Sequence, residues 1–95
     1  MIAVDTAVKT ACDVVGIPIE QFTDPERIEE NVDARGIAYK LLKDGNKWGL
    51  ERIGRIWGRE HSIVRWNIKR VNESLDVGGT LGELYTECFR RINAS

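Results

Sequence analysis

The 95-residue chain is long enough for one small domain, and we expect residues 1–95 to form a single unit. Its composition, 42% hydrophobic and 31% charged, is that of a globular protein, and no apolar run approaches the ~20 residues of a membrane span. Two cysteines are too few for a disulfide framework or a zinc site, and the overall net charge of −1 gives no sign of a nucleic-acid partner.

The N-terminal segment predicts a helix from about Asp5 to Val15, ended by Gly16, which suits the left-handed turn after a helix. Its first residues carry no basic side chain, and Asp5 interrupts the apolar run, so we do not interpret it as a signal peptide. We expect a cytoplasmic protein, with reduced cysteines, in the bacterial cytosol or nucleoid.

The second helix has two possible starts. Ile17-Pro18 breaks the chain, and residues 19–22 predict one short turn. Asp24-Pro25 is a helix-start signal, so the helix begins there or near Asp33. In both cases its apolar face contains Ile37, Ala38, Leu41 and Leu42, and residues 44–46 (Asp-Gly-Asn) end it.

Two helices in close succession follow. Residues 49–57 predict a short helix, Gly58 predicts a tight turn, and residues 60 to about 75 predict a longer helix. In the longer helix Val64, Ile68, Val71 and Leu75 recur at helical spacing on one narrow face, which predicts the buried side.

The last segment predicts a loop at Val77-Gly78-Gly79 and then a helix opened by a capping box from Thr80 to Glu83. Its inward residues are predicted to be Leu84, Phe89 and Ile92. Strand-like alternation appears nowhere over a useful length, so the sequence predicts a compact all-α fold of about five or six helices.

The charges are unevenly distributed along the chain. Residues 1–34 carry eight acidic side chains against two basic ones, a net of −6, whereas residues 35–71 carry ten basic against three acidic, a net of +7. Residues 72–95 return to −2. This pattern predicts one basic region on an acidic body, although a solvated charged surface without any partner is an equal alternative on charge alone.

The basic region coincides with a predicted helix-turn-helix. Residues 50–71, LERIGRIWGREHSIVRWNIKRV, combine a short helix, a turn containing glycine and a longer helix. Gly54 allows the two helices to approach closely, and Gly58 can adopt the positive φ of the turn. Ile53, Trp57 and Val64 are expected to pack where the helices meet.

The outward face of the longer helix carries candidate DNA contacts. With Val64 inside, the side chains of Arg59, Ser62, Trp66 and Lys69 are expected to point outward, flanked by Arg65 and Arg70. The alternative for Trp66 is packing against a neighbouring helix of the same chain. His61 is either a base-contacting imidazole or part of the helix cap.

The sequence does not predict an enzyme. Ser62 follows His61 directly, and successive helix residues do not face each other as a nucleophile and its base must. The glycines at 78, 79 and 82 lack the lysine and the spacing of a phosphate loop. We expect no cofactor, no metal and no small-molecule substrate.

Residues 58–64, GREHSIV, resemble the signature Gly-Gly-Arg-Asp-His-Thr-Thr-Val of the C-terminal DNA-binding domain of the bacterial replication initiator DnaA. LERIGRIWG and ARGIAYKLLKD are similar to two further segments of that family, and VKTACDVVGIPIEQF resembles its opening helix, so the resemblance extends from about Val8 to Ile92. It implies a Trp-repressor-like helical domain that recognises a short duplex site.

The resemblance also implies which residues act. Arg59, Glu60, His61 and Ser62 occupy the positions that contact bases and adjacent phosphates, and Arg35 and Lys43 match positions that hold the DNA backbone. From both arguments we predict base contacts from Arg59, Glu60, His61, Ser62, Arg65, Trp66 and Lys69, and phosphate contacts from Arg35, Lys43, Lys47 and Arg55.

The sequence departs from the family in several places. One signature glycine is missing, Ile63 replaces a Thr, and Trp66 replaces a later His. The basic loop that reaches the minor groove in the family is replaced by DPERIEENVD at residues 24–33, whose acids cannot neutralise phosphate. We expect no ATPase module to accompany the domain.

The sequence thus predicts a sequence-specific duplex-DNA-binding module, an accessory of replication or transcription that we assign to a phage or mobile element and that acts with a replication or regulatory protein. The alternative is a protein-interaction adaptor that keeps the helical scaffold but has lost DNA binding, with the acidic first third and Trp66 as its working surface.

Overall fold

The computed structural model describes residues 1–25 and 28–94. Within these residues the chain is helical, without strands, which confirms the all-α prediction. Its elements are α1 (Val4–Val15), the short 3-10 helix η1 (Ile19–Thr23), α2 (Glu29–Asn46), α3 (Leu50–Ile56), α4 (His61–Val77) and α5 (Thr80–Ala94). No helix in the described part of the chain has the length and apolar character to span a bilayer.

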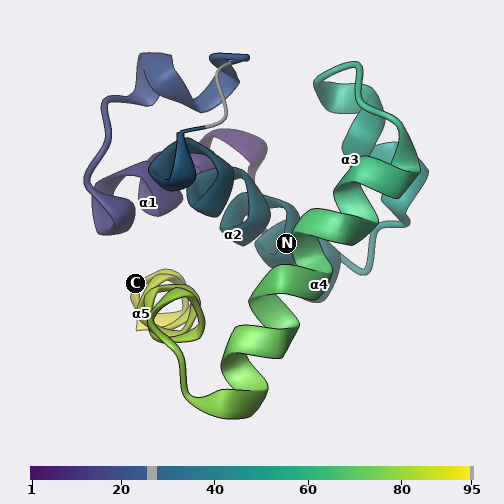
Figure 1. The fold of residues 1–95 in the computed structure, drawn as a ribbon. Coiled ribbons are helices and arrows are strands. Elements are labelled where there is room, and N and C mark those ends of the chain that lie inside the picture. The colour runs from purple at the N-terminus through teal and green to yellow at the C-terminus, as the bar shows by residue number, and fades with distance from the viewer. Residues whose placement is uncertain (26–27, 95) are drawn as a thin grey trace.

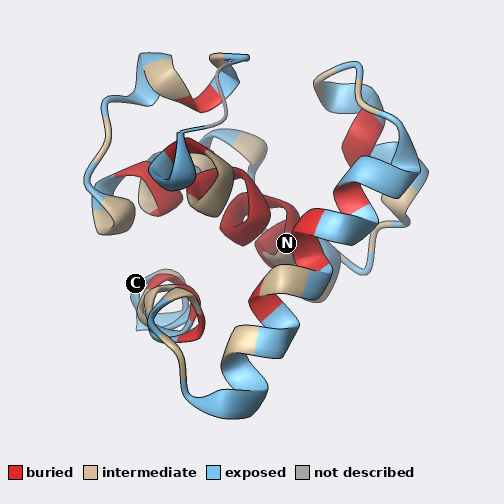
Figure 2. Ribbon diagram, viewed as in Figure 1, coloured by how far each residue is buried: buried red, intermediate tan, exposed pale blue. Residues whose placement is uncertain are grey.

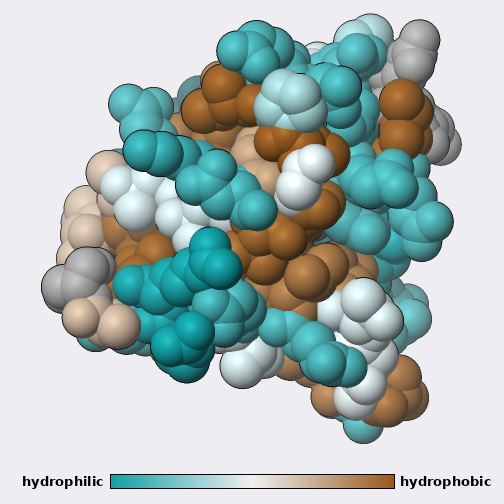
Figure 3. Space-filling model, turned by 90° about the vertical axis from the view of Figure 1, so that its left-hand side faces the viewer, coloured by the Kyte–Doolittle hydropathy of each residue, from teal (hydrophilic) through white to brown (hydrophobic). Residues whose placement is uncertain are grey.

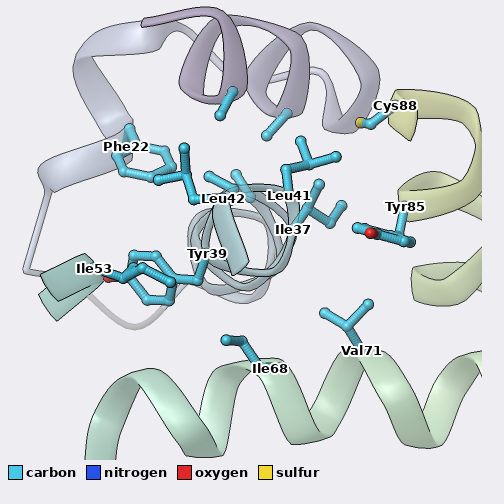
Figure 4. Packing of buried hydrophobic residues seen from close by; sticks show 14 of the residues in the cluster. Phe22, Ile37, Tyr39, Leu41, Leu42, Ile53, Ile68, Val71, Tyr85 and Cys88 are labelled. Atoms are coloured by element: carbon cyan, nitrogen blue, oxygen red, sulfur yellow. The ribbon is translucent and has the colours of Figure 1, made fainter. Parts of the chain in front are cut away.

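Helix α2 forms the centre of the molecule, and the other helices pack around it (Figure 1). The view along α2 shows α1 on one side, α4 on the opposite side, and α5 and η1 with α3 on the two remaining sides (Figure 4). Ile37, Tyr39, Leu41 and Leu42 of α2 are fully buried, and α2 is the most continuously buried element (Figure 2). Burial of each large apolar side chain contributes about 1.5–3 kcal/mol.

The core is less completely covered on the side of α1. Ala7, Ala11 and Cys12 are buried against α2, but Val8 and Val15 are only partly buried. Figure 3 views the molecule from this side and shows hydrophobic side chains gathered between hydrophilic ones. The small residues of α1 therefore allow close packing against α2. Its valines cover only part of the hydrophobic surface on this side of the core.

The start of α2 differs from both predictions. The helix begins at Glu29, because Ile28, the residue before it, has extended backbone with a ψ of 134°. The predicted start at Asp24-Pro25 is wrong, because neither Pro25 nor Ile28 is helical; Glu26 and Arg27, which would complete its first turn, lie outside the described residues. Thus only the second half of the acidic 24–33 segment, from Glu29 onward, is helical.

Helix α2 ends at Asn46, within the predicted stop at residues 44–46, and Lys47 follows with a φ of 60°. The Asn46 side chain accepts a hydrogen bond from the Ile2 amide (2.6 Å) and donates one to the Ile2 carbonyl (2.9 Å). Gly45 stays helical, and any Cβ there would collide with the Ile2 side chain. The end of α2 therefore packs against the N-terminus, with Asn46 bonded to a residue 44 positions away in sequence.

Helix α5 is capped by another helix rather than by its own sequence. Ser74 Oγ of α4 accepts the Gly82 N–H at 2.8 Å, and the Glu83 amide donates to the Gly79 carbonyl. The predicted capping box is therefore wrong: Thr80 already belongs to the first turn.

The inward face of α5 is shifted from the predicted one. Gly82, Tyr85 and Cys88 are buried, Leu84 and Ile92 are half-buried, and Phe89 is 38% exposed. The prediction of an inward Phe89 is wrong because small residues at 82 and 88 let α5 lie close to its neighbours. The Phe89 ring remains at the edge, 6.1 Å from that of Tyr85.

Candidate functional site

The short helix α3, the turn after it and helix α4 form one closely packed unit. Gly49 precedes α3, Gly58 adopts a φ of 66° in the turn, and the Arg59 amide donates to the Gly54 carbonyl at 2.8 Å. A Cβ at Gly54 would lie only 2.3 Å from the Arg59 carbonyl oxygen. The roles predicted for Gly54 and Gly58 are confirmed.

The aromatic residue of the turn has a different partner from the one expected. Ile53 and Val64 are fully buried where α3 meets α4, as predicted. Trp57 instead lies between Phe22 of η1 and Tyr39 of α2, with ring centroids 5.4 Å from each. It therefore joins the α3–turn–α4 unit to the rest of the molecule.

Three of the four aliphatic residues predicted to anchor α4 are buried. Val64 and Val71 are fully buried and Ile68 is 5% exposed. Figure 4 shows Ile68 and Val71 on the side of α4 that faces α2. Leu75 is 36% exposed, so its prediction is wrong. Gly82 of α5 packs against the backbone of Leu75, which leaves the leucine side chain at the rim.

The opposite side of α4 is open to solvent. Six of the seven residues predicted to contact bases are exposed and only Arg59 is half-buried; the six are Glu60, His61, Ser62, Arg65, Trp66 and Lys69. Trp66 is 55% exposed, with the Arg70 guanidinium 5.3 Å from its ring centroid, so it is not packed inside the chain. The surface of these seven residues is called the α4 face below.

The N-terminus of α4 is suited to a negatively charged group. The carbonyl of Glu60 accepts the amides of Ile63 and Val64, so the amides of His61 and Ser62 are not used by the helix. No acidic residue lies in the first turn of α4, and neither Glu60 nor another side chain caps it. The partial positive charge of the helix terminus therefore adds to that of Arg59 and Arg65.

The four predicted phosphate ligands fall into two groups. Lys43, Lys47 and Arg55 are exposed, on α2, at its end and on α3. Arg35 is 8% exposed, and its Nη1 donates to the carbonyls of Phe22 (2.9 Å) and Asp24 (3.0 Å). Arg35 thus ties η1 and the segment after it to α2, a structural contact that the sequence did not indicate.

One acidic side chain of the front part of the chain is paired with an arginine of α4. Asp33 Oδ1 accepts a hydrogen bond from Arg70 Nη2 at 3.0 Å, and both side chains are largely buried. Lys69 lies 3.8 Å from Glu73 of its own helix, and both of these side chains remain in solvent. The α4 face is therefore bordered by an acidic residue but not covered by it.

A pocket of about 300 Å³ lies between α2 and α4, next to the α4 face. Its lining includes Arg59, Ser62 and Trp66 of that face together with Tyr39 and Asn67. Burial raises the pKa of Tyr39, while the nearby charges of Arg59 and Arg35 act to lower it.

Sequence reasoning missed Tyr39 and Asn67 as pocket residues. Asn67 lies three residues after Val64 and four before Val71, so the helical period of the anchor residues places it on the inward face. The closeness of Tyr39 to Arg59 depends on how α2 crosses α4, which no local pattern reports.

The chain has weak similarity to DnaA proteins over most of its length. No protein-family model matches it. It is 25% identical over 79 residues to the chromosomal replication initiator protein DnaA of Mycoplasma pneumoniae, an alignment that covers 83% of this chain and 18% of that protein. It is 23% identical over 92 residues to DnaA of Thermodesulfovibrio yellowstonii, covering 96% of this chain and 21% of that protein. The chain spans about a fifth of the length of these relatives.

Proposed function

We propose that residues 1–95 form one DNA-binding domain that recognises a short duplex site through a helix-turn-helix made of α3 and α4. The observation that carries the proposal is the two-sided character of α4: Val64, Ile68 and Val71 anchor it in the core, and the α4 face remains exposed. A recognition helix needs this arrangement because base edges in the major groove are read by side chains projecting from a fixed helix.

The roles within the site follow from position. The major groove is faced by Arg59, Ser62, Arg65, Trp66 and Lys69, with Glu60 and His61 at the helix start. The free amides of the first turn of α4 and the exposed Lys43, Lys47 and Arg55 hold phosphates on either side. Arg35 positions the segment 22–24 against α2 and contributes to DNA binding indirectly.

The similarity to DnaA supports this proposal, because those relatives are chromosomal replication initiators. We further propose that the protein is an accessory of replication or transcription, encoded by a phage or mobile element, that works in the cytoplasm by binding rather than by catalysis. The duplex it prefers can be identified by selecting bound sequences from a random pool.

Two substitutions test the division of roles on the selected duplex. Ser62→Ala is expected to change the preference at one base pair by about 1–3 kcal/mol. Lys43→Gln should weaken binding to all sequences alike, and it should reduce the salt slope, the steepness with which log K falls with log[salt], by about 1. Fluorescence anisotropy titrations at several salt concentrations, on the selected duplex and on its single-base variants, measure both effects. Equal weakening of every sequence by both changes would contradict the assignment.

The exposed apolar residues of α4 favour a second candidate, a protein-interaction adaptor. Trp66 is 55% exposed and Ile63 is 41% exposed, and residues three apart lie next to each other on a helix. Such neighbouring exposed apolar side chains are typical of contact surfaces. Absence of binding to random and AT-rich duplexes, even at low salt, would favour the adaptor over the DNA-binding domain.

A further inference from the structure

The pocket between α2 and α4 has the chemistry of a ligand site. Its volume of about 300 Å³ is at the lower end of the range for small-molecule pockets. A smaller cavity of about 70 Å³ shares Arg35, Tyr39 and Arg59 with it and adds Phe22 and Trp57. The two cavities therefore adjoin each other along one row of aromatic and cationic side chains.

The charge of the lining favours an anion. Arg35 and Arg59 line both cavities, and none of the described residues that line them carries a carboxylate. This is unusual in a chain with 15 acidic residues and a net charge of −1. Arg35 is engaged by backbone carbonyls, so Arg59, which is half-buried, is the cation that an entering anion would meet.

The remaining lining favours an aromatic ring with a hydrogen-bond donor. Trp66 and Tyr39 supply ring surfaces at opposite depths, since Trp66 is 55% exposed and Tyr39 is 1% exposed. Asn67 is 4% exposed; its Nδ2 donates to the Ile63 carbonyl at 2.9 Å, and its Oδ1 has no hydrogen-bond partner. A buried acceptor without a partner is unfavourable, and a ligand N–H or O–H would satisfy it.

We propose that this pocket binds a small anionic aromatic molecule that carries a hydrogen-bond donor, and that the bound molecule antagonises DNA binding. The second half rests on the proposed function, because Arg59, Ser62 and Trp66 belong both to the pocket and to the α4 face. A ligand paired with Arg59 prevents that guanidinium from contacting DNA. The aromatic ring of the ligand also packs against Trp66 and fixes the position of the indole.

The first experiment uses the whole chain without DNA. The probe is 4-hydroxyphenylacetate, which has the ring, the donor and the anion; phenylacetate lacks the donor, and tyramine has a cation instead of the anion. Titrations followed by amide and indole NMR shifts are expected to give a dissociation constant on the order of millimolar for the first probe, as suits its size. The shifts should centre on Trp66 and Asn67. Equal binding of tyramine, or no shift at these residues, overturns the proposal.

Variants separate binding from general damage to the fold. Arg59→Gln is expected to weaken the binding of 4-hydroxyphenylacetate by about fivefold or more, because the ion pair is lost. Arg65→Gln, the same substitution on the same helix but outside the pocket, should leave probe affinity unchanged. Asn67→Leu should abolish the preference for 4-hydroxyphenylacetate over phenylacetate, a ratio that a merely less stable protein would retain. Retention of that ratio in Asn67→Leu overturns the role of the buried acceptor.

The second experiment adds the selected duplex. Near saturation with the probe, the apparent dissociation constant for DNA is expected to rise at least about fivefold, as required when two ligands exclude each other. If the probe binds and DNA does not, the proposed function fails and the pocket stands. If DNA binds with the same affinity in the presence of bound probe, the antagonism is disproved.

Discussion

Gly54 is the residue on which the geometry of the α3–turn–α4 unit depends most directly. A methyl group at this position would lie 2.3 Å from the Arg59 carbonyl oxygen and 3.3 Å from a Val64 methyl group. The first of these neighbours is backbone, which cannot rotate away. Any larger residue must therefore separate α3 from α4 or unwind the turn.

We predict that Gly54→Ala destabilises the protein by about 1–3 kcal/mol, the usual range for overpacking. Gly49→Ala is the matched control, because a Cβ there meets nothing within 4 Å; as a change at a helix N-cap it should cost less than about 1 kcal/mol. Urea denaturation followed by circular dichroism measures both. Equal stability of the two variants would mean that the close approach at Gly54 is not required.

Arg35 shows that the type of a residue does not determine which partner its side chain binds. Its basic side chain in a positively charged segment predicts a phosphate contact, and an arginine has donors enough for several acceptors. The structure directs Nη1 to the Phe22 and Asp24 carbonyls, 13 and 11 residues earlier in the chain. Only the path of η1 across α2 decides between these uses, and no sequence pattern near Arg35 reports that path.

Helix ends show the same principle at the scale of elements. The Thr80–Glu83 spacing is a valid capping box in isolation, yet the α5 amide at Gly82 bonds to Ser74 Oγ. Ser74 is near the end of α4, and the tight Gly78-Gly79 connection brings it opposite the start of α5. A cap from a neighbouring helix replaces the local one because it satisfies the same orphan amide.

Ser74→Ala is therefore expected to lower the free energy of unfolding by about 1 kcal/mol, the typical cost of removing an N-terminal cap. Thr80→Ala, which removes the hydroxyl of the predicted capping box, should change it by less than about 0.5 kcal/mol. Chemical denaturation of the two variants gives the comparison. A larger loss of unfolding free energy for Thr80→Ala than for Ser74→Ala would show that Thr80, and not Ser74, caps α5.

Helices α2 and α5 are joined by a polar contact at the edge of the core. Tyr85 donates a hydrogen bond to Asp44 Oδ2 at 2.7 Å, Lys40 lies 2.9 Å from the same oxygen, and Lys40 Nζ is 5.1 Å from the centre of the Tyr85 ring. Burial acts to raise the pKa of Asp44, but the hydrogen bonds from Tyr85 and Lys40 outweigh it and hold the pKa below its ordinary value of 3.8.

This contact should make the free energy of unfolding decrease as the solution becomes acidic. Because the folded pKa of Asp44 is lower than the unfolded one, the stabilisation is complete above about pH 4 and is lost as the pH falls through the folded pKa. Tyr85→Phe is expected to cost about 1 kcal/mol at pH 7, a modest value since Asp44 is 36% exposed. The difference between wild type and Tyr85→Phe in urea denaturation should shrink below pH 4. A constant difference would rule out Asp44 as the acceptor.

At the scale of the whole molecule, the acidic front part and the basic α4 meet at Asp33 and Arg70. Their side chains are 16% and 28% exposed, so the pair is screened less than a surface ion pair. The Arg70 guanidinium also lies 5.3 Å from the centre of the Trp66 ring. The acidic N-terminal third therefore neutralises one arginine of α4 at the border of the α4 face.

Replacing Asp33 by Asn should release Arg70 toward DNA. We expect Asp33→Asn to lose about 1 kcal/mol of stability and to tighten duplex binding several-fold at low salt, with the salt slope steeper by about 0.9 for one additional phosphate. Asp5→Asn is the control: it makes the same change in net charge on exposed α1 and should leave the slope unchanged. Identical effects of the two variants would show that only overall charge matters.

The helical class, the positions of most elements and the outward side of α4 could be predicted from the sequence, because the period of Val64, Ile68 and Val71 and the turn glycines are local properties. Its errors lie where distant segments meet. Trp57 packs between Phe22 and Tyr39, and Gly82 meets the backbone at Leu75.

The tertiary structure alone decided which polar groups are used inside the molecule and which remain for a partner. The pocket beside Arg59 and the pairing of Asp33 with Arg70 exist only once α2 has crossed α4, because their side chains come from both helices. Spacing along one helix predicts which residues share a face. It does not predict what that face meets, since this depends on the crossing geometry of elements far apart in the chain.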